Sequence, residues 1–174
     1  MQENNFDNQQ KSPNRRKKDI SAWEQTLRWL NAKWYSEKKL VEKLRKLHYP
    51  AAEIDDVLQK CRDYGFVNDD MLAEEFAKTQ SSRGRGSRRI ANELYRHGLT
   101  GEAAEKALEL IAPNDEEAAR TALQSKLASW KNETDWRKKR EKAFRFLANR
   151  GFPLDIIYQV LDEELKTPSN TDWD

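Results

Sequence analysis

The sequence predicts an all-α fold, an elongated array of three tandem three-helix repeats with about nine helices. The main observation is an internal repeat: one spacing of apolar and turn residues recurs at offsets of 50 and then 53 residues, in copies that begin at Leu44, Leu94 and Leu147. Apolar residues also recur at the three- and four-residue spacing of helices. Glycine and proline stand between these segments, where they begin or end helices. Such a period favours stacked helical units over one globular core.

The repeat divides the 174 residues into five parts. They are a basic and polar tail at 1–19, repeat 1 at 20–67, repeat 2 at 68–113, repeat 3 at 114–166 and a short end at 167–174. Both ends are predicted to be disordered, because they are polar and carry few apolar residues. The basic tail is either a solvated end or an arm that touches nucleic acid.

Repeat 1 shows how each three-helix unit is expected to form. Its first helix, at 20–34, places apolar residues on one face: Ile20, Trp23, Leu27, Leu30 and Trp34. Ser36 is predicted to cap the second helix, and Pro50 to open the third. Gly65 supplies a left-handed stop, and Phe66 packs back over it.

Repeats 2 and 3 are predicted in the same way. Asp69 is expected to cap the first helix of repeat 2, Ser87 to cap the second, and Gly98 to end it. The third helix of repeat 2 covers 100–111. The helices of repeat 3 are expected at about 115–130, 135–149 and 153–166.

The composition suits an elongated protein. Charged residues make up 36% of the chain, compared with roughly 25% in an average globular protein. Cys61 is the single cysteine, which excludes an intramolecular disulfide and fits a reducing compartment. No apolar run is long enough to span a membrane. We therefore expect a cytoplasmic protein, monomeric and without membrane contact.

Charge follows position in the repeat, although the net charge is only +2. The middle segments are basic, with five Lys or Arg against two acids at 37–47, five against one at 83–97, and seven against two at 135–150. The third helices are acidic. If the repeats stack with a common hand, the middle helices form one basic stripe that is complementary to phosphates. The alternative is that these faces are solvated and carry i,i+4 pairs such as Glu42–Lys46.

The loop at 81–87 is the candidate contact with an acidic partner. Its glycines allow a close backbone approach and let arginines reorient, and the amides at the following helix start favour an anion. A loop without function is the alternative. The predicted partner- or DNA-binding residues are Arg83, Arg85, Arg88, Arg89 and Arg96, and then Lys138, Lys139, Arg140 and Arg145.

No catalytic or metal-binding motif is present in the sequence. It has no G-x-x-x-x-G-K-[ST] phosphate loop, no C-x-x-C and no H-E-x-x-H. His48 and His97 are expected at helix ends, where they favour the helix dipole rather than bind a metal. Trp130 and Trp136 either pack between repeats or stack on a base. We expect a protein that is not an enzyme and has no cofactor or metal.

Four passages resemble the RecX family of bacterial recombination regulators. The most specific is Arg83-Gly84-Arg85-Gly86-Ser87-Arg88-Arg89-Ile90, followed by Glu93-Leu94 and Gly98-Leu99. The others lie at 35–44, 65–76 and 144–152. Members of the family often have Pro where Ser87 stands and Arg where Gln80 stands. Together the matches cover roughly residues 20–165.

The resemblance implies a function as well as a fold. It implies three repeats of three helices, and direct binding to RecA recombinase on its nucleoprotein filament. That binding would dampen filament growth, ATP hydrolysis and strand exchange, as part of the control of DNA repair and the SOS response. Contacts with single- and double-stranded DNA would be weak and accessory. The alternatives are a general nucleic-acid-binding repeat protein that acts without RecA, and a helical scaffold for some other partner.

Overall fold

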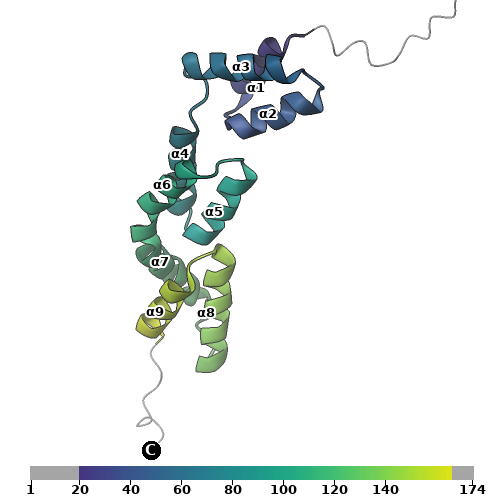
Figure 1. Cartoon of the computed structure of the whole chain (residues 1–174). Helices are drawn as coiled ribbons and strands as arrows, with labels where there is room; N and C mark the ends of the chain where they lie inside the picture. The colour runs from purple at the N-terminus through teal and green to yellow at the C-terminus, as the bar shows by residue number, and fades with distance from the viewer. Residues whose placement is uncertain (1–19, 166–174) are drawn as a thin grey trace, which may run out of the picture.

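The computed structural model describes residues 20–165, and all the regular structure in that range is helical (Figure 1). The predicted all-α, elongated array is confirmed. Its α-helices are α1 (Ala22–Ala32), α2 (Glu37–Lys46), α3 (Ala51–Asp63), α4 (Asp69–Ser82), α5 (Ser87–Arg96), α6 (Glu102–Ile111), α7 (Asp115–Leu127), α8 (Trp136–Arg150) and α9 (Leu154–Glu164). Short 3-10 turns follow α6 and α7. The two predicted tails lie outside the described residues.

Each set of three helices encloses its own core. The first core is built around Leu40, Leu44, Ile54, Val57 and Cys61, the second around Ala73, Ala77, Ile90, Leu94 and Ala107, and the third around Leu123, Ala143, Leu147, Ile157 and Val160. The three cores share no buried residue. The molecule is therefore a chain of small cores, as Figure 1 shows, and most of its surface is solvated. None of the described helices combines the length and apolar character needed to cross a bilayer.

The internal repeat appears in the backbone at the end of each middle helix. Five residues after Leu44, Leu94 and Leu147, an amide closes the turn on the carbonyl of that leucine, from Tyr49, Leu99 and Phe152 respectively. The residue before each closing amide has a positive φ, 62° at His48, 79° at Gly98 and 83° at Gly151. These bonds satisfy carbonyls that the helix end leaves without partners.

Two predicted helix caps are wrong by one residue. Asn68, not Asp69, caps α4, and its side chain accepts a bond from the amide of Met71 at 3.0 Å. Gly86, not Ser87, is the N-cap of α5, which has no side-chain cap. In both cases the expected residue is the first of its helix. Both residues instead make a hydrogen bond with the neighbouring repeat, Asp69 with Glu37 and Ser87 with Asp115. Ser36 caps α2 as predicted.

Candidate basic interface

The middle helices α8 and α5 meet end to end. The amide of Gly86 at the start of α5 donates to the carbonyl of Arg150 at 2.9 Å. The amide of Arg88 donates to the carbonyl of Gly151 at 3.1 Å. The carbonyls at the end of one helix therefore satisfy the amides at the start of the next. The negative end of the α8 dipole faces the positive end of the α5 dipole, which is the favourable orientation.

The end of α5 likewise meets the start of α2, here through a side chain instead of backbone amides. The hydroxyl of Ser36 donates to the carbonyl of His97 at 2.6 Å, and it accepts from the amide of Lys39 at 3.3 Å. A Cβ on Gly98 would lie 2.8 Å from the Ser36 hydroxyl. The helices α8, α5 and α2 thus follow one another end to end, here called the middle-helix column, with α2 turned across the direction of α8 and α5 (Figure 1).

The glycines of the 81–87 loop are packed, in contrast to the loose helix start expected from the sequence. A Cβ on Gly86 would lie 2.3 Å from the backbone nitrogen of Phe152, and one on Gly151 would lie 2.3 Å from the Cβ of Arg89. Gly84 has a φ of 69° and closes the end of α4. The loop is a junction between repeats 2 and 3, and its glycines allow two backbones to touch.

The amides at the start of α5 are already occupied. Besides the two bonds to the end of α8, the amide of Ser87 donates to the carboxylate of Asp115 at 3.2 Å. Asp69 plays the part of Asp115 at the preceding joint, where its carboxylate accepts a hydrogen bond from the amide of Glu37 at 3.1 Å. The anion site predicted from backbone amides is therefore wrong, because carbonyls and a carboxylate of the protein fill it. Any phosphate at this point must be bound by side chains.

These two aspartates act as equivalent joints between repeats. Asp115 is only 3% exposed, and burial raises its pKa, against the lowering effect of its bonds from Ser87. Burial likewise raises the pKa of Asp69, against the bond from the Glu37 amide. Each residue is the first of its helix and reaches back to the middle helix of the preceding repeat. This contact explains why neither serves as a conventional cap or acceptor on its own helix.

Two of the predicted arginines are held by one carboxylate. Arg85 donates to both oxygens of Glu93, at 2.9 and 2.7 Å, and Arg89 donates to it through Nε at 3.0 Å. Arg89 also donates to the carbonyl of Asn149 on α8 at 3.3 Å. Burial alone would raise the pKa of Glu93, but the two guanidinium groups outweigh burial and hold that pKa below its usual value. Arg89 therefore bridges the junction to α8, whereas Arg85 ties the loop to α5 within repeat 2.

The other predicted arginines of repeat 2 are exposed. Arg83, Arg88 and Arg96 take part in no ion pair with another residue of the range 20–165. Arg88 and Arg96 lie two turns apart on α5 and line, with Arg89, a polar groove of about 370 Å³ between α5 and the end of α8. The structure thus brings Arg88, Arg89 and Arg96 together, while Arg83 lies outside this groove and Arg85 serves as an anchor.

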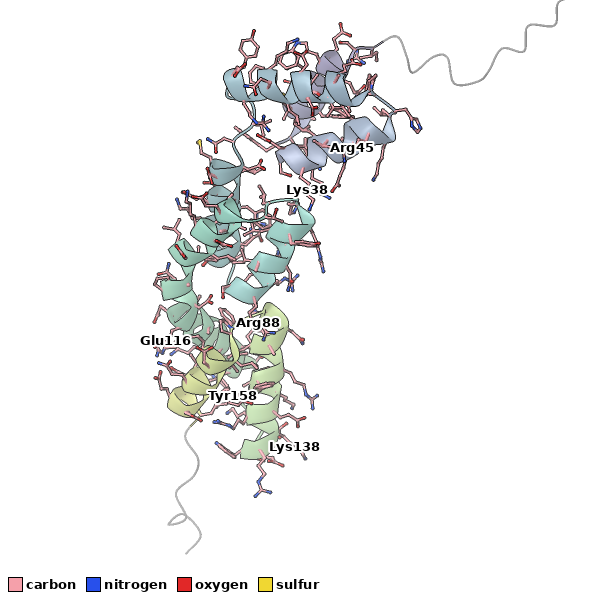
Figure 2. The ribbon with its side chains drawn as sticks, viewed as in Figure 1. Lys38, Arg45, Arg88, Glu116, Lys138 and Tyr158 are labelled. Atoms are coloured by element: carbon pink, nitrogen blue, oxygen red, sulfur yellow. The ribbon has the colours of Figure 1, made fainter. Side chains whose placement is uncertain are left out.

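The predicted residues of repeat 3 are distributed along α8. Three are paired: Lys138 with Asp135 at 3.6 Å, Arg140 with Asp162 of α9 at 2.5 Å, and Arg145 with Glu141. The pairs of Lys138 and Arg145 are solvated surface pairs within one helix, which contribute little stability and leave the charge accessible. Arg140 is turned toward α9. Figure 2 shows Lys138, Arg88, Lys38 and Arg45 along the side of the molecule formed by α8, α5 and α2.

Repeat 1 contributes basic residues that the predicted set omits. At the repeat offset of 50, Arg88, Arg89 and Arg96 correspond to Lys38, Lys39 and Lys46 of α2. Lys38 and Lys46 are exposed, as is Arg45. The repeat itself is the signal that could have identified them, because it maps the three groove-lining arginines onto lysines of the preceding repeat.

Trp130 and Trp136 belong to the packing of repeat 3. The ring of Trp130 meets that of Phe146 edge to face, with centroids 6.1 Å apart, and it packs against the third core. Trp136 is half-buried beneath the guanidinium of Arg140, which lies 5.6 Å from its ring. These contacts lie within repeat 3 and not between repeats as expected, and they favour packing over base stacking.

Comparisons with known proteins agree with this architecture. Models of the first, second and third three-helix domains of RecX match residues 22–61, 68–108 and 114–161. A regulatory protein RecX from Chromohalobacter salexigens is 34% identical over 135 residues, which cover 78% of this chain and 87% of that protein. One from Syntrophotalea carbinolica is 28% identical over 146 residues, covering 82% and 95%. The crystal structure of RecX from Lactobacillus salivarius superimposes with a TM-score of 0.73 at 27% identity, covering 82% of this chain and 93% of that chain. With three family domains in tandem over most of its length, the chain belongs to the RecX family.

Proposed function

We propose that this protein binds RecA nucleoprotein filaments and dampens filament growth, ATP hydrolysis and strand exchange. Family membership and the resemblance of the 83–99 passage support the partner. The observation that carries the proposal is the middle-helix column. In it three helices from three repeats join end to end and present exposed lysine and arginine side chains. An elongated, basic column is complementary to a helical filament that carries phosphates along its length.

Accessory contacts with DNA would be made by side chains of this column. The groove lined by Arg88, Arg89 and Arg96 is the first candidate, and Lys138, Lys139 and Arg145 of α8 extend it. Arg83 lies beside the same column. Glu93 holds both Arg85 and Arg89, but the Arg89 side chain is 45% exposed and remains accessible. Arg85 and Arg140, whose side chains are 33% and 25% exposed, support the contact indirectly through their pairs with Glu93 and Asp162. The protein would act in the cytoplasm as a monomeric regulator without catalytic activity of its own.

The test is the single-stranded-DNA-dependent ATPase of RecA from the same source, titrated with this protein from far below to above equimolar. Inhibition at a small fraction of the RecA concentration supports the proposal, because blocking a growing filament end requires few molecules. Absence of inhibition even at an excess of this protein would contradict it.

A general nucleic-acid-binding protein is the second candidate. The exposed Arg88 and Arg96, which form no ion pair within residues 20–165, favour it. This candidate also predicts inhibition of RecA, but only near saturation of the DNA. Added DNA would then relieve the inhibition. The stoichiometry of inhibition and its response to added DNA therefore separate the two functions.

A further inference from the structure

A cavity of about 310 Å³ lies between repeats 1 and 2, where α5 ends and α2 begins. Its volume falls at the lower end of the range for small-molecule sites, about 300–1,000 Å³. Four of the residues that line it carry flat rings: Trp34, Tyr35, Phe76 and His97. This cavity, here called the junction pocket, is therefore an aromatic site on the middle-helix column.

The walls of the junction pocket are fixed by contacts across the repeat boundary. The rings of Phe76 and His97 pack together with centroids 5.0 Å apart. The carbonyl of His97 accepts a hydrogen bond from the hydroxyl of Ser36, which links the end of α5 to the start of α2. Leu99, which is 1% exposed, closes the apolar floor. The pocket is thus preformed rather than dependent on a partner for its shape.

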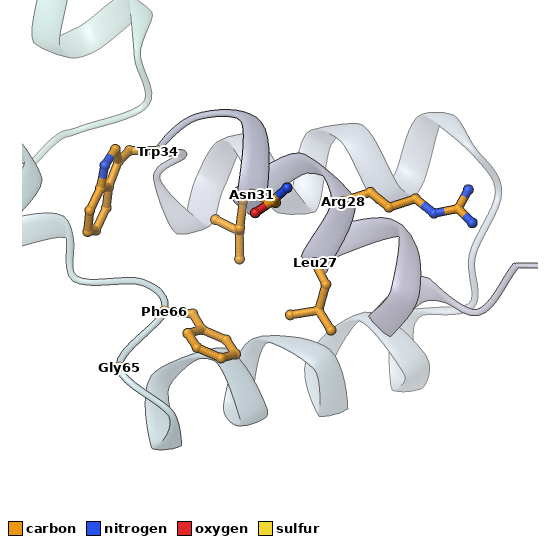
Figure 3. Close-up of a pocket in the computed structure, with 7 residues that line it drawn as sticks. Leu27, Arg28, Asn31, Trp34, Gly65 and Phe66 are labelled. Carbon is orange, nitrogen blue, oxygen red and sulfur yellow. The ribbon is translucent and has the colours of Figure 1, made fainter.

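Trp34 is the exposed wall of the pocket. It follows the end of α1, its side chain projects away from that helix, and it is 69% exposed (Figure 3). It also borders the apolar hollow of about 610 Å³ that contains Leu27 and Phe66. A tryptophan at this level of exposure contributes little to its own core and offers a large flat face to a ligand.

The rim of the junction pocket is basic. Lys33 and Lys39 line it, and no acidic residue of the described chain does. Lys33 lies 4.8 Å from the ring of Tyr35, and it forms no ion pair within residues 20–165. Lys39 is paired with Glu42 at 2.7 Å, and its side chain is 34% exposed. Flat apolar walls and a cationic rim are complementary to an aromatic ring that carries an adjacent negative charge.

We propose that the junction pocket receives one unstacked base of a single-stranded DNA, with the neighbouring phosphate at Lys33 and Lys39. This inference rests on the DNA contact of the middle-helix column proposed above. It adds that the DNA bound there is single-stranded. Base–aromatic stacking tolerates any sequence, because every base has a π-face. A duplex offers no such base without the cost of unpairing and extruding it. The pocket therefore favours single strands over duplexes.

The first test compares the affinity of the full chain and of Trp34→Ala for a fluorescently labelled oligothymidylate and for a duplex of equal length. Loss of a base–aromatic stack is expected to weaken single-strand binding about five-fold or more. Duplex affinity should not change, and the salt dependence should keep its slope because no phosphate contact is removed. Tyr64→Ala is the matched control, since Tyr64 is 65% exposed in the same repeat but does not line the pocket.

The second test replaces the oligothymidylate by an abasic strand that has the same phosphates. The native chain should bind the abasic strand about as weakly as Trp34→Ala binds the oligothymidylate. The affinity of Trp34→Ala should be the same for both strands. Equal affinity of the native chain for both strands would overturn the proposal. So would a Trp34→Ala variant that binds DNA normally but inhibits RecA poorly, because the pocket would then receive a protein side chain. RecA inhibition by the native chain is measured separately, so a failed base pocket leaves the proposed function standing.

Discussion

Replacement of Gly86 by alanine should separate repeats 2 and 3, although the backbone at Gly86 is ordinary. Its φ is −78° and its ψ is 157°, values that any residue adopts. The obstacle is the Cβ, which would lie 2.3 Å from the backbone nitrogen of Phe152 and 2.4 Å from its Cα. Both contacts are with backbone atoms, which cannot rotate away as a side chain would. The end of α8 must therefore move away from the start of α5.

The expected cost follows from what that movement disrupts. Overpacking at a tight contact costs about 1–3 kcal/mol. The bonds from Gly86 to Arg150 and from Arg88 to Gly151 contribute about 0.5–1.5 kcal/mol each. Alanine lowers the conformational entropy of the unfolded chain, which stabilises the folded state by about 0.4–1 kcal/mol and offsets part of this cost. The net destabilisation of the junction should be about 1–6 kcal/mol.

Urea unfolding followed by circular dichroism gives the free energy of unfolding, and amide hydrogen exchange at Gly86 and Arg88 reports the junction directly. The control is Gly65→Ala, where φ is 66° and no atom lies within 4 Å of the added Cβ. That variant carries only backbone strain, about 1–2 kcal/mol. A Gly86→Ala protein that is as stable as the native chain, with unchanged exchange at both amides, would refute the packed-junction reasoning.

Three further predictions concern charge and core. The double variant Arg88→Gln, Arg96→Gln should weaken DNA binding and reduce the log–log salt slope by about two, as fluorescence anisotropy at several salt concentrations would show; an unchanged slope would remove these residues from the interface. Glu93→Gln should cost about 1–2 kcal/mol, because both anchoring arginines lose their charged partner. The pKa of Glu93 is lowered in the folded state, so its contribution is present above its ordinary pKa of about 4.5 and is lost as pH falls through the lowered value. The acid limb of the stability curve should therefore be flatter in the variant. Leu147→Ala, which empties a fully buried site, should cost about 2–5 kcal/mol and affect repeat 3 most in amide exchange.

The fold was predictable because its signals are local and repeated. The helix stop at Gly98 recurs at Gly151, and a leucine stands four residues before each glycine, Leu94 and Leu147 respectively. The caps were less predictable, since Asn68 and Asp69 are both good capping residues and the sequence does not distinguish them. The amide of Glu37, 32 residues away along the chain, decides the outcome by taking the carboxylate of Asp69. The predicted repeat boundaries stay predictions.

The candidate site depended on contacts that no local pattern shows. A glycine that frees a loop and a glycine that admits a second backbone look identical in sequence, and only the end of α8 against Gly86 distinguishes them. The i,i+4 spacing of Arg89 and Glu93 indicates a helix pair, but the bond from Arg85 to Glu93 spans the loop and the helix start. The junction pocket gathers residues from 33 to 99, so only the tertiary structure reveals it.

The two joints of the column share a backbone design and differ in their side chains. At each joint an aspartate takes the first amide of the middle helix, and a glycine turn from the next repeat meets its start. The groove of Arg88, Arg89 and Arg96 at the second joint corresponds to Lys38, Lys39 and Lys46 at the first joint, so both joints carry basic residues there. The junction pocket, with its four rings, lies at another place on the first joint. A strand that contacts both sites would meet a surface for a base in the junction pocket and a surface for phosphate in the groove of Arg88 and Arg96, which is why the Trp34 and Arg88 variants should fail in different ways.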